Sequence, residues 1–149
     1  MTSVYYEDFT VGQTREFGPR TVTREEIVAF ASEFDPQPMH LDENAAKKTI
    51  LGGLGASGWH TCVVMMKLLC DGLLLESSSQ GSPGIDEVKW KKPVRPGDAL
   101  SVRHTILETR ESKSRAGVGL VRQQCDVLNQ HGESVLEMRF TAMFGKRKS

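Results

Sequence analysis

The sequence predicts an α+β protein in which the helices are segregated from an antiparallel sheet. Helical spacing of apolar residues dominates the first half of the chain, whereas the residues after Gly84 alternate between apolar and polar side chains. Between these parts, residues 57–75 would form a long helix that is apolar on most sides, a pattern typical of a buried helix. Such a helix needs a sheet to wrap around it, so the two halves are expected to pack as layers.

The first half of the chain carries clear start and stop signals for helices. Thr23 and Glu26 have the spacing of a capping box, in which each side chain satisfies a free backbone donor of the other residue. Pro36 disfavours helical geometry in the residue before it and should end that helix. The predicted elements are a short strand over 13–17 closed by Gly18-Pro19, a helix over 24–34, a short helix over 42–48 capped by Asp42, and the long helix capped by Ser57.

The second half of the chain predicts an antiparallel meander. Val88 and Trp90 share one face of a strand that precedes the turn sequence 93–98. Residues 129–132, Asn-Gln-His-Gly, are a hairpin signal between two long alternating runs. The remaining strands are expected over 100–106, 116–128 and 136–144.

Composition restricts the class of protein. A chain of 149 residues is most simply one domain spanning 1–149, and its 19 basic and 19 acidic residues give a net charge of zero. That balance argues against a nucleic-acid or membrane-surface partner. The three cysteines form no CxxC motif, and the N-terminus lacks the features of a signal peptide. We therefore expect a cytoplasmic protein with reduced thiols and no membrane span.

The stretch over 35–40 is the strongest candidate for chemistry. Asp35 and His40 lie on either side of Pro36 and Pro38, which stiffen the segment between them. A carboxylate and an imidazole held on a stiff loop can act together on a proton or a water. The alternative is an ordinary helix stop followed by a solvated histidine.

Several stretches together resemble the MaoC-like dehydratases, relatives of the R-specific enoyl-CoA hydratases, which have a hot-dog fold. The resemblance is carried by Tyr-Glu-Asp-Phe-Thr-Val-Gly at 6–12, by Asp-Pro-Gln-Pro-Met-His-Leu-Asp-Glu-Asn-Ala-Ala at 35–46, by Ala-Ser-Gly at 56–58 and by Pro-Val-Arg-Pro-Gly-Asp at 93–98. These stretches occur in the family's order and span almost the whole chain, which is much more specific than any one motif.

The resemblance implies a hydro-lyase that adds water to, or removes it from, a 2-enoyl-CoA thioester. Asp35 and His40 would be the catalytic pair, and the backbone N–H of Gly58 would hold the thioester oxygen. No cofactor is implied, because the CoA thioester is itself the substrate. The residues expected to bind the substrate are Gln37, Ser57 and Trp59. Trp59 also lies on the apolar stripe of the long helix and would belong to the core.

Departures from the family pattern affect the expected acyl specificity. Phe34 stands where the family commonly has Gly, and Gln37 stands where it commonly has Asn. Relatives also place a Ser further along the central helix to support the catalytic pair. This helix offers only Thr61 as a hydroxyl after Ser57, so that supporting role stays unassigned.

Two other functions compete with hydration. A hot-dog thioesterase usually carries its carboxylate on the central helix, which here offers only Asp71 and Glu76, both far from its start. An acyl-CoA-binding module without turnover is the other alternative, since fold does not determine function. In each case a homodimer or a higher homo-oligomer is expected, from the resemblance and because an open sheet leaves an edge strand to be covered.

The remaining polar residues give weaker signals. The four histidines lack the spacing of metal ligands, so no metal site is predicted. His60 is close to Gly58 in sequence, but a structural role is the more common one for a histidine in such a place. The basic run 89–92 with Arg95 either meets the phosphates of CoA or is a solvated strand face.

Overall fold

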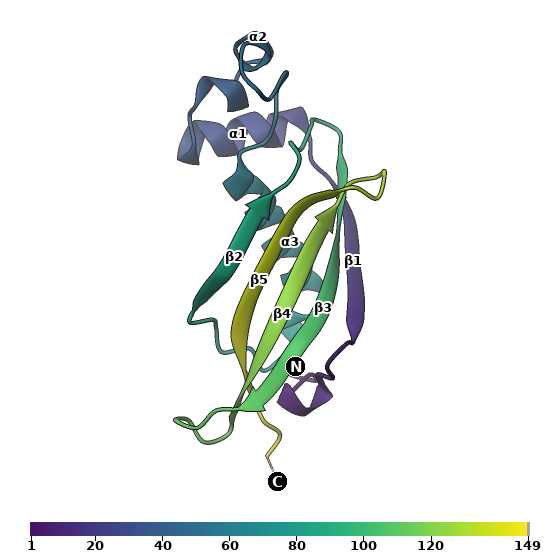
Figure 1. Ribbon diagram of the computed structural model, residues 1–149, viewed down its shortest axis with the longest axis vertical. Coiled ribbons are helices and arrows are strands. Elements are labelled where there is room, and N and C mark those ends of the chain that lie inside the picture. Colours follow the sequence, from purple (N-terminus) through teal and green to yellow (C-terminus); the bar gives the residue numbers. More distant parts are fainter. Residues whose placement is uncertain (149) are drawn as a thin grey trace.

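The protein consists of one five-stranded antiparallel sheet curved around a long helix (Figure 1). The computed structural model describes residues 1–148. The strands are β1 (Thr14–Thr21), β2 (Gly84–Trp90), β3 (Ala99–Glu111), β4 (Val118–Leu128) and β5 (Ser134–Gly145), in the spatial order β1-β3-β4-β5-β2. The α+β class predicted from the sequence is confirmed.

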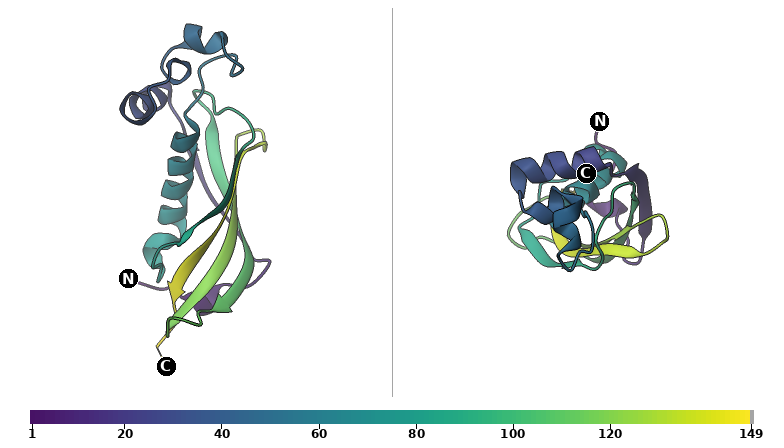
Figure 2. Two further views of the ribbon diagram at one scale, coloured as in Figure 1. Left: turned by 60° about the vertical axis from the view of Figure 1, so that its left-hand side comes forward. Right: turned by 90° about the horizontal axis from the view of Figure 1, so that it is seen from above.

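The helices lie on one side and at one end of the sheet. The helical elements are α1 (Arg24–Phe34), α2 (Glu43–Lys47), α3 (Gly58–Gly72) and the short 3-10 turns Tyr6–Asp8, Pro38–His40 and Leu74–Glu76. Helix α3 runs along one face of the sheet, and α1 and α2 lie beyond its N-terminal end (Figure 2). Among residues 1–148, no helix is long and apolar enough to cross a membrane.

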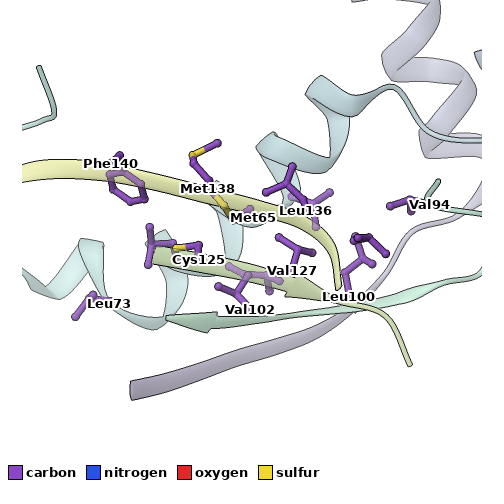
Figure 3. Close-up of a cluster of buried hydrophobic side chains, with 14 of the residues drawn as sticks. Met65, Leu73, Val94, Leu100, Val102, Cys125, Val127, Leu136, Met138 and Phe140 are labelled. Carbon is purple, nitrogen blue, oxygen red and sulfur yellow. The ribbon is translucent and has the colours of Figure 1, made fainter. Parts of the chain in front are cut away.

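The core fills the space between α3 and the inner face of the sheet (Figure 3). Alternate residues of β3, β4 and β5 point into it, as the period-two pattern predicted. The labelled side chains are Met65, Leu73, Val94, Leu100, Val102, Cys125, Val127, Leu136, Met138 and Phe140. Met65 is the labelled residue that lies in α3, and its burial shows which face of the helix is turned toward the sheet.

Strand β1 is longer than predicted. The sequence analysis closed it at Gly18-Pro19, but the strand continues to Thr21 through a shift of register between Phe17 and Arg20. Gly18 makes this irregularity feasible, because its φ is 103° and a Cβ there would lie 2.9 Å from the carbonyl oxygen of Leu100.

The first helix begins at the predicted residue, but only half of the predicted capping box forms. The Thr23 hydroxyl accepts a hydrogen bond from the Glu26 N–H. The Glu26 carboxylate lies 3.5 Å from Arg20 instead of returning to the Thr23 backbone. A single cap is enough to set the start of α1.

The prediction that α3 is buried on most sides is wrong. Trp59 is 61% exposed, Val63 46% and Met66 41%, so the stripe that they form points away from the sheet. The reason is architectural, because one sheet covers one face of a helix and no second layer formed by residues 1–148 lies over the other face (Figure 2). Trp59 and Met66 are therefore not core residues, whereas Met65 is.

Candidate active site

The end of α1 places a carboxylate beside an imidazole. Asp35 terminates the helix, with its N–H donating to the Ala31 carbonyl at 2.9 Å. Pro36 then forces the chain out of helical geometry, and Pro38 starts the 3-10 turn that ends at His40. The turn brings His40 Nε2 to 3.5 Å from Asp35 Oδ2, so the predicted pair is assembled.

The second ring nitrogen of His40 determines how the imidazole is protonated. His40 Nδ1 lies 2.8 Å from the carbonyl oxygen of Gly55, and the side chain is almost fully buried. A carbonyl can only accept, so Nδ1 must carry a proton. In the neutral ring Nε2 is then a free acceptor directed at Asp35.

Both oxygens of Asp35 accept hydrogen bonds from neutral side chains. Ser57 Oγ donates to Oδ2 at 2.7 Å, and Gln37 Nε2 donates to Oδ1 at 2.7 Å. These bonds, that of Ser57 first, hold the pKa of the Asp35 carboxyl below its usual value of 3.8. Ser57 supplies the supporting hydroxyl that the sequence analysis could not assign, from the cap of α3 rather than from Thr61. Its predicted role in substrate binding is less direct, since Ser57 is fully buried.

Gly58 is the first residue of α3, directly after the Ser57 cap. A helix N-terminus carries unpaired N–H groups and partial positive charge, which makes the Gly58 N–H a candidate donor to an oxyanion. The Trp90 indole packs on this glycine and donates to its carbonyl at 2.9 Å. A Cβ at residue 58 would lie 2.5 Å from Trp90 Nε1, so the close packing requires glycine.

A cavity of about 370 Å³ joins these groups, within the size range of small-molecule sites. Its walls are mainly apolar. The residues that line it are Asp35, Gln37, His40, Leu51, Ala56, Gly58, Trp59, Thr61, Trp90, Lys91, Lys92, Pro93 and Val94. The structure thus brings together five of the six predicted site residues around one cavity, and the sixth, Ser57, is buried and bonded to Asp35. Trp90 was missed because its sequence position indicated only a strand face.

The geometry suits a water held by two acceptors. Asp35 Oδ2 and His40 Nε2 are 3.5 Å apart, and both residues line the same cavity as Gly58. When the imidazole is neutral and Nδ1 carries its proton, Oδ2 and Nε2 are both acceptors. A water has two protons to donate, and this pair offers two acceptors. The same cavity therefore contains groups that can activate a water and a donor that can stabilise a developing oxyanion.

His60 does not join this group. Its ring stacks on Phe30 of α1, with 4.8 Å between ring centroids, and it does not line the cavity. Burial lowers the pKa of His60 from its usual 6.5. The structural role favoured by the sequence analysis fits this position between α1 and α3.

The lysines of the basic run 89–92 beside the cavity are paired with acidic side chains of this chain. Lys89 pairs with Glu87 at 3.1 Å and Lys91 pairs with Glu137 at 2.7 Å. Lys92 pairs with Glu133, while Arg95 binds backbone carbonyls. Within residues 1–148, no cluster of three or more histidine, cysteine or acidic side chains is placed to hold a metal.

Comparison with known proteins agrees with this architecture. Residues 8–127 match the MaoC-like domain. A solved MaoC-like dehydratase from Rhodospirillum rubrum is 40% identical, with a TM-score of 0.89 over 99% of this chain and 100% of that one. The 3-hydroxybutyryl-CoA dehydratase of Methylorubrum extorquens is 27% identical over 91% of this chain and 84% of its own.

The fold also matches that of a Mycobacterium tuberculosis protein described as having a double hot-dog fold. That protein is 17% identical, with a TM-score of 0.80 over 97% of this chain and 45% of that one, and it shows the fold alone. The sheet wrapped around α3 is a hot-dog fold, as the resemblance implied. The chain belongs to the MaoC-like dehydratase family.

Proposed function

We propose that this protein is a hydro-lyase that adds water to, or removes it from, a 2-enoyl-CoA thioester in the cytoplasm. The observation that carries the proposal is the pair of acceptors on Asp35 and His40, 3.5 Å apart, in one cavity with the N-terminus of α3. The similarity to a 3-hydroxybutyryl-CoA dehydratase supports a CoA thioester as the substrate class. The proposed chemistry needs only side chains, backbone and water.

In the proposed hydration, the thioester oxygen accepts from the Gly58 N–H. This contact polarises the conjugated system and stabilises the enolate, and one such donor contributes about 2.7–4 kcal/mol in comparable oxyanion holes. The water held by Asp35 and His40 attacks the β-carbon and gives one proton to the pair. The pair then returns a proton to the α-carbon, so the enzyme is unchanged at the end of the cycle. Gln37 and Trp59 would contact the bound substrate.

The test is a panel of 2-enoyl-CoAs of increasing chain length, followed by absorbance of the conjugated double bond and by release of free thiol. Loss of absorbance without thiol is the expected result. The chain length that reacts fastest would define the acyl pocket. Binding of the panel with neither signal would contradict the proposal and favour the non-catalytic acyl-CoA-binding module.

The alternative thioesterase has less structural support. Asp71 lies at the far end of α3 from the cavity and pairs with Lys67 on the surface at 3.1 Å. Glu76 lies beyond that end of the helix. Among the described residues that line the cavity, Asp35 is the one carboxylate. Thiol release by the purified protein would nevertheless establish the thioesterase.

We also infer a homodimer. Strand β2 is an open edge of the sheet, and its Ile85 and Trp90 are about half exposed. Trp90 contacts Trp59, which begins the exposed apolar stripe of α3, so edge and stripe are continuous. A second copy could pair with β2 and cover these side chains. Light scattering at micromolar concentration should give twice the chain mass, and a monomer would contradict the inference.

A further inference from the structure

The segment over 51–55, which supplies the carbonyl partner of His40, is bound by one distant guanidinium. Arg95 Nη1 donates to the carbonyl of Gly53 at 2.7 Å and to that of Leu54 at 3.3 Å. Arg95 Nη2 donates to the carbonyl of Leu51. One planar guanidinium thus binds three carbonyls within four consecutive residues.

Backbone N–H groups of this segment and of Ala56 just after it also have hydrogen-bond partners. The Leu54 N–H donates to the Glu43 carboxylate at 2.9 Å, and the Ala56 N–H donates to the Val94 carbonyl at 2.9 Å. Residues 53–57 are buried, so their backbone groups need internal partners. Arg95 therefore satisfies the carbonyls of Gly53 and Leu54, which lie in this buried stretch.

Arg95 itself starts from a rigid turn. Its N–H donates to Asp98 Oδ2 at 2.8 Å, and the other oxygen of Asp98 accepts from the Gln130 side chain at 2.9 Å. The guanidinium thus projects from an anchored backbone, and its bonds to the loop are charge-assisted, which makes them stronger than neutral ones.

We propose that Arg95 is a positioning residue that sets the protonation pattern of His40 through this segment. The chain of contacts runs from the guanidinium to the carbonyls over 51–54, then to the Gly55 carbonyl, and from there to His40 Nδ1 at 2.8 Å. With Gly55 held, the proton stays on Nδ1 and Nε2 remains the acceptor that faces Asp35. The catalytic part of this inference rests on the proposed hydration, whereas the tautomer of His40 does not.

The experiment compares the wild type with Arg95→Ala and Arg95→Lys in two measurements. Imidazole ¹⁵N shifts, with His40 assigned from a His40→Ala spectrum, report the tautomer without any substrate. The wild type should show a proton on Nδ1, and Arg95→Ala should show a mixture of tautomers. Lysine has one ammonium that cannot span the three carbonyls, so Arg95→Lys should resemble Arg95→Ala more than the wild type.

Turnover of the best enoyl-CoA is the second measurement. A displacement of about 1 Å in a catalytic group can cost about 10²-fold, so kcat should fall by that order in Arg95→Ala while KM changes much less. Millimolar guanidinium should restore part of kcat, and the same concentration of urea should not. Arg147→Ala is the matched control, because it removes an arginine that binds Asp8 at the far end of the molecule.

The outcomes separate this proposal from the proposed function. Folded Arg95→Ala with the wild-type tautomer and kcat would overturn the role of Arg95. If Arg95→Ala does not fold, Arg95→Lys decides by the same criteria. A wild type that is inactive on the whole panel would refute the hydration, while the tautomer measurement would still support or overturn the action of Arg95 on His40.

Discussion

Ser57 Oγ donates a hydrogen bond to Asp35 Oδ2 at 2.7 Å, which ties the start of α3 to the end of α1. The same hydroxyl accepts from the Trp59 N–H at 3.3 Å and so also caps α3. One side chain therefore sets both the orientation of the carboxylate and the position of the helix terminus that faces the cavity.

Replacing Ser57 by alanine should change the pH dependence of activity. Removing a donor to the charged form raises the pKa of Asp35, which the proposed reaction needs ionised. The acid limb of kcat/KM should therefore move to higher pH, and turnover should fall by about tenfold or more, since hydrogen bonds to charged groups are worth about 1.5–3 kcal/mol.

The matched control for Ser57→Ala is Thr23→Ala, which removes the N-cap of α1. Loss of either cap should cost stability of about 1 kcal/mol. Only Ser57→Ala should change the pH profile, and an unshifted acid limb would contradict the role assigned to this hydroxyl.

Asp35→Asn and His40→Ala should each lose about 10²–10⁴-fold in activity, the range typical of general acid–base groups. Circular dichroism should show both variants folded, although His40 is buried and its truncation will lower the melting temperature more. Asp71→Asn is the control, since it removes a carboxylate of α3 that pairs with Lys67 on the surface. Loss of activity in Asp71→Asn, with Asp35→Asn active, would instead fit the thioesterase.

Gly58→Ala should impair turnover by about 10²-fold, the loss expected when a site is displaced by about 1 Å. The added Cβ would lie 2.5 Å from Trp90 Nε1, so the indole must leave its place at the helix N-terminus. Tryptophan fluorescence should report that movement. Gly84→Ala offers a comparison, because nothing lies within 4 Å of a Cβ at that position. Equal kinetics in the two variants would refute the steric argument.

Two buried histidines should make the fold sensitive to mild acid. Burial lowers the pKa of His60 and His104 below the usual 6.5, so the unfolded chain binds more protons as the pH falls below that value. Their contribution to stability is full above pH 6.5 and falls with decreasing pH, by at most about 1.4 kcal/mol per pH unit for each histidine. Urea midpoints between about pH 8 and 5.5 measure this.

His60→Phe should weaken that dependence while keeping a ring against Phe30. His131→Ala, in an exposed turn, should leave it unchanged. The interpretation fails if His60→Phe follows the same curve as the wild type.

Phe140→Ala should cost about 3–5 kcal/mol of stability, because the ring is buried in the core. The sequence analysis placed Trp59 in the core, which would imply a similar loss for Trp59→Ala. Its exposed ring predicts a much smaller effect on the stability of the isolated chain. Trp59→Ala should instead weaken the proposed dimer, seen as a lower apparent mass on dilution. An unchanged mass at all concentrations would argue against α3 as part of that interface.

The sequence predicted the helices and the Asp35–His40 pair because both depend on short-range signals. Caps, proline stops and alternation are encoded by neighbouring residues. The exposed side of α3 could not be predicted in this way, since hydropathy does not state how many layers cover a helix. Trp59 consequently seemed to belong to the core by its pattern alone.

Contacts between distant residues account for what the sequence analysis missed in the site. Ser57 and Asp35 meet only because α1 packs near the start of α3. The indole of Trp90 reaches Gly58 from an edge strand, and Arg95 reaches the loop over 51–54 from a turn. Each of these contacts depends on how distant elements pack in three dimensions, which no local motif reports.

The reacting groups and the cavity walls come from separate stretches of the chain. Asp35, His40 and Gly58 precede strands β2 to β5, whereas much of the wall is formed by residues 90–94, at the end of β2 and in the connection to β3. Substitutions in the wall can therefore alter the shape offered to a ligand without touching the groups that handle the proton. In evolutionary terms, the preference for one ligand over another can diverge among descendants of this chain while the reaction is inherited intact.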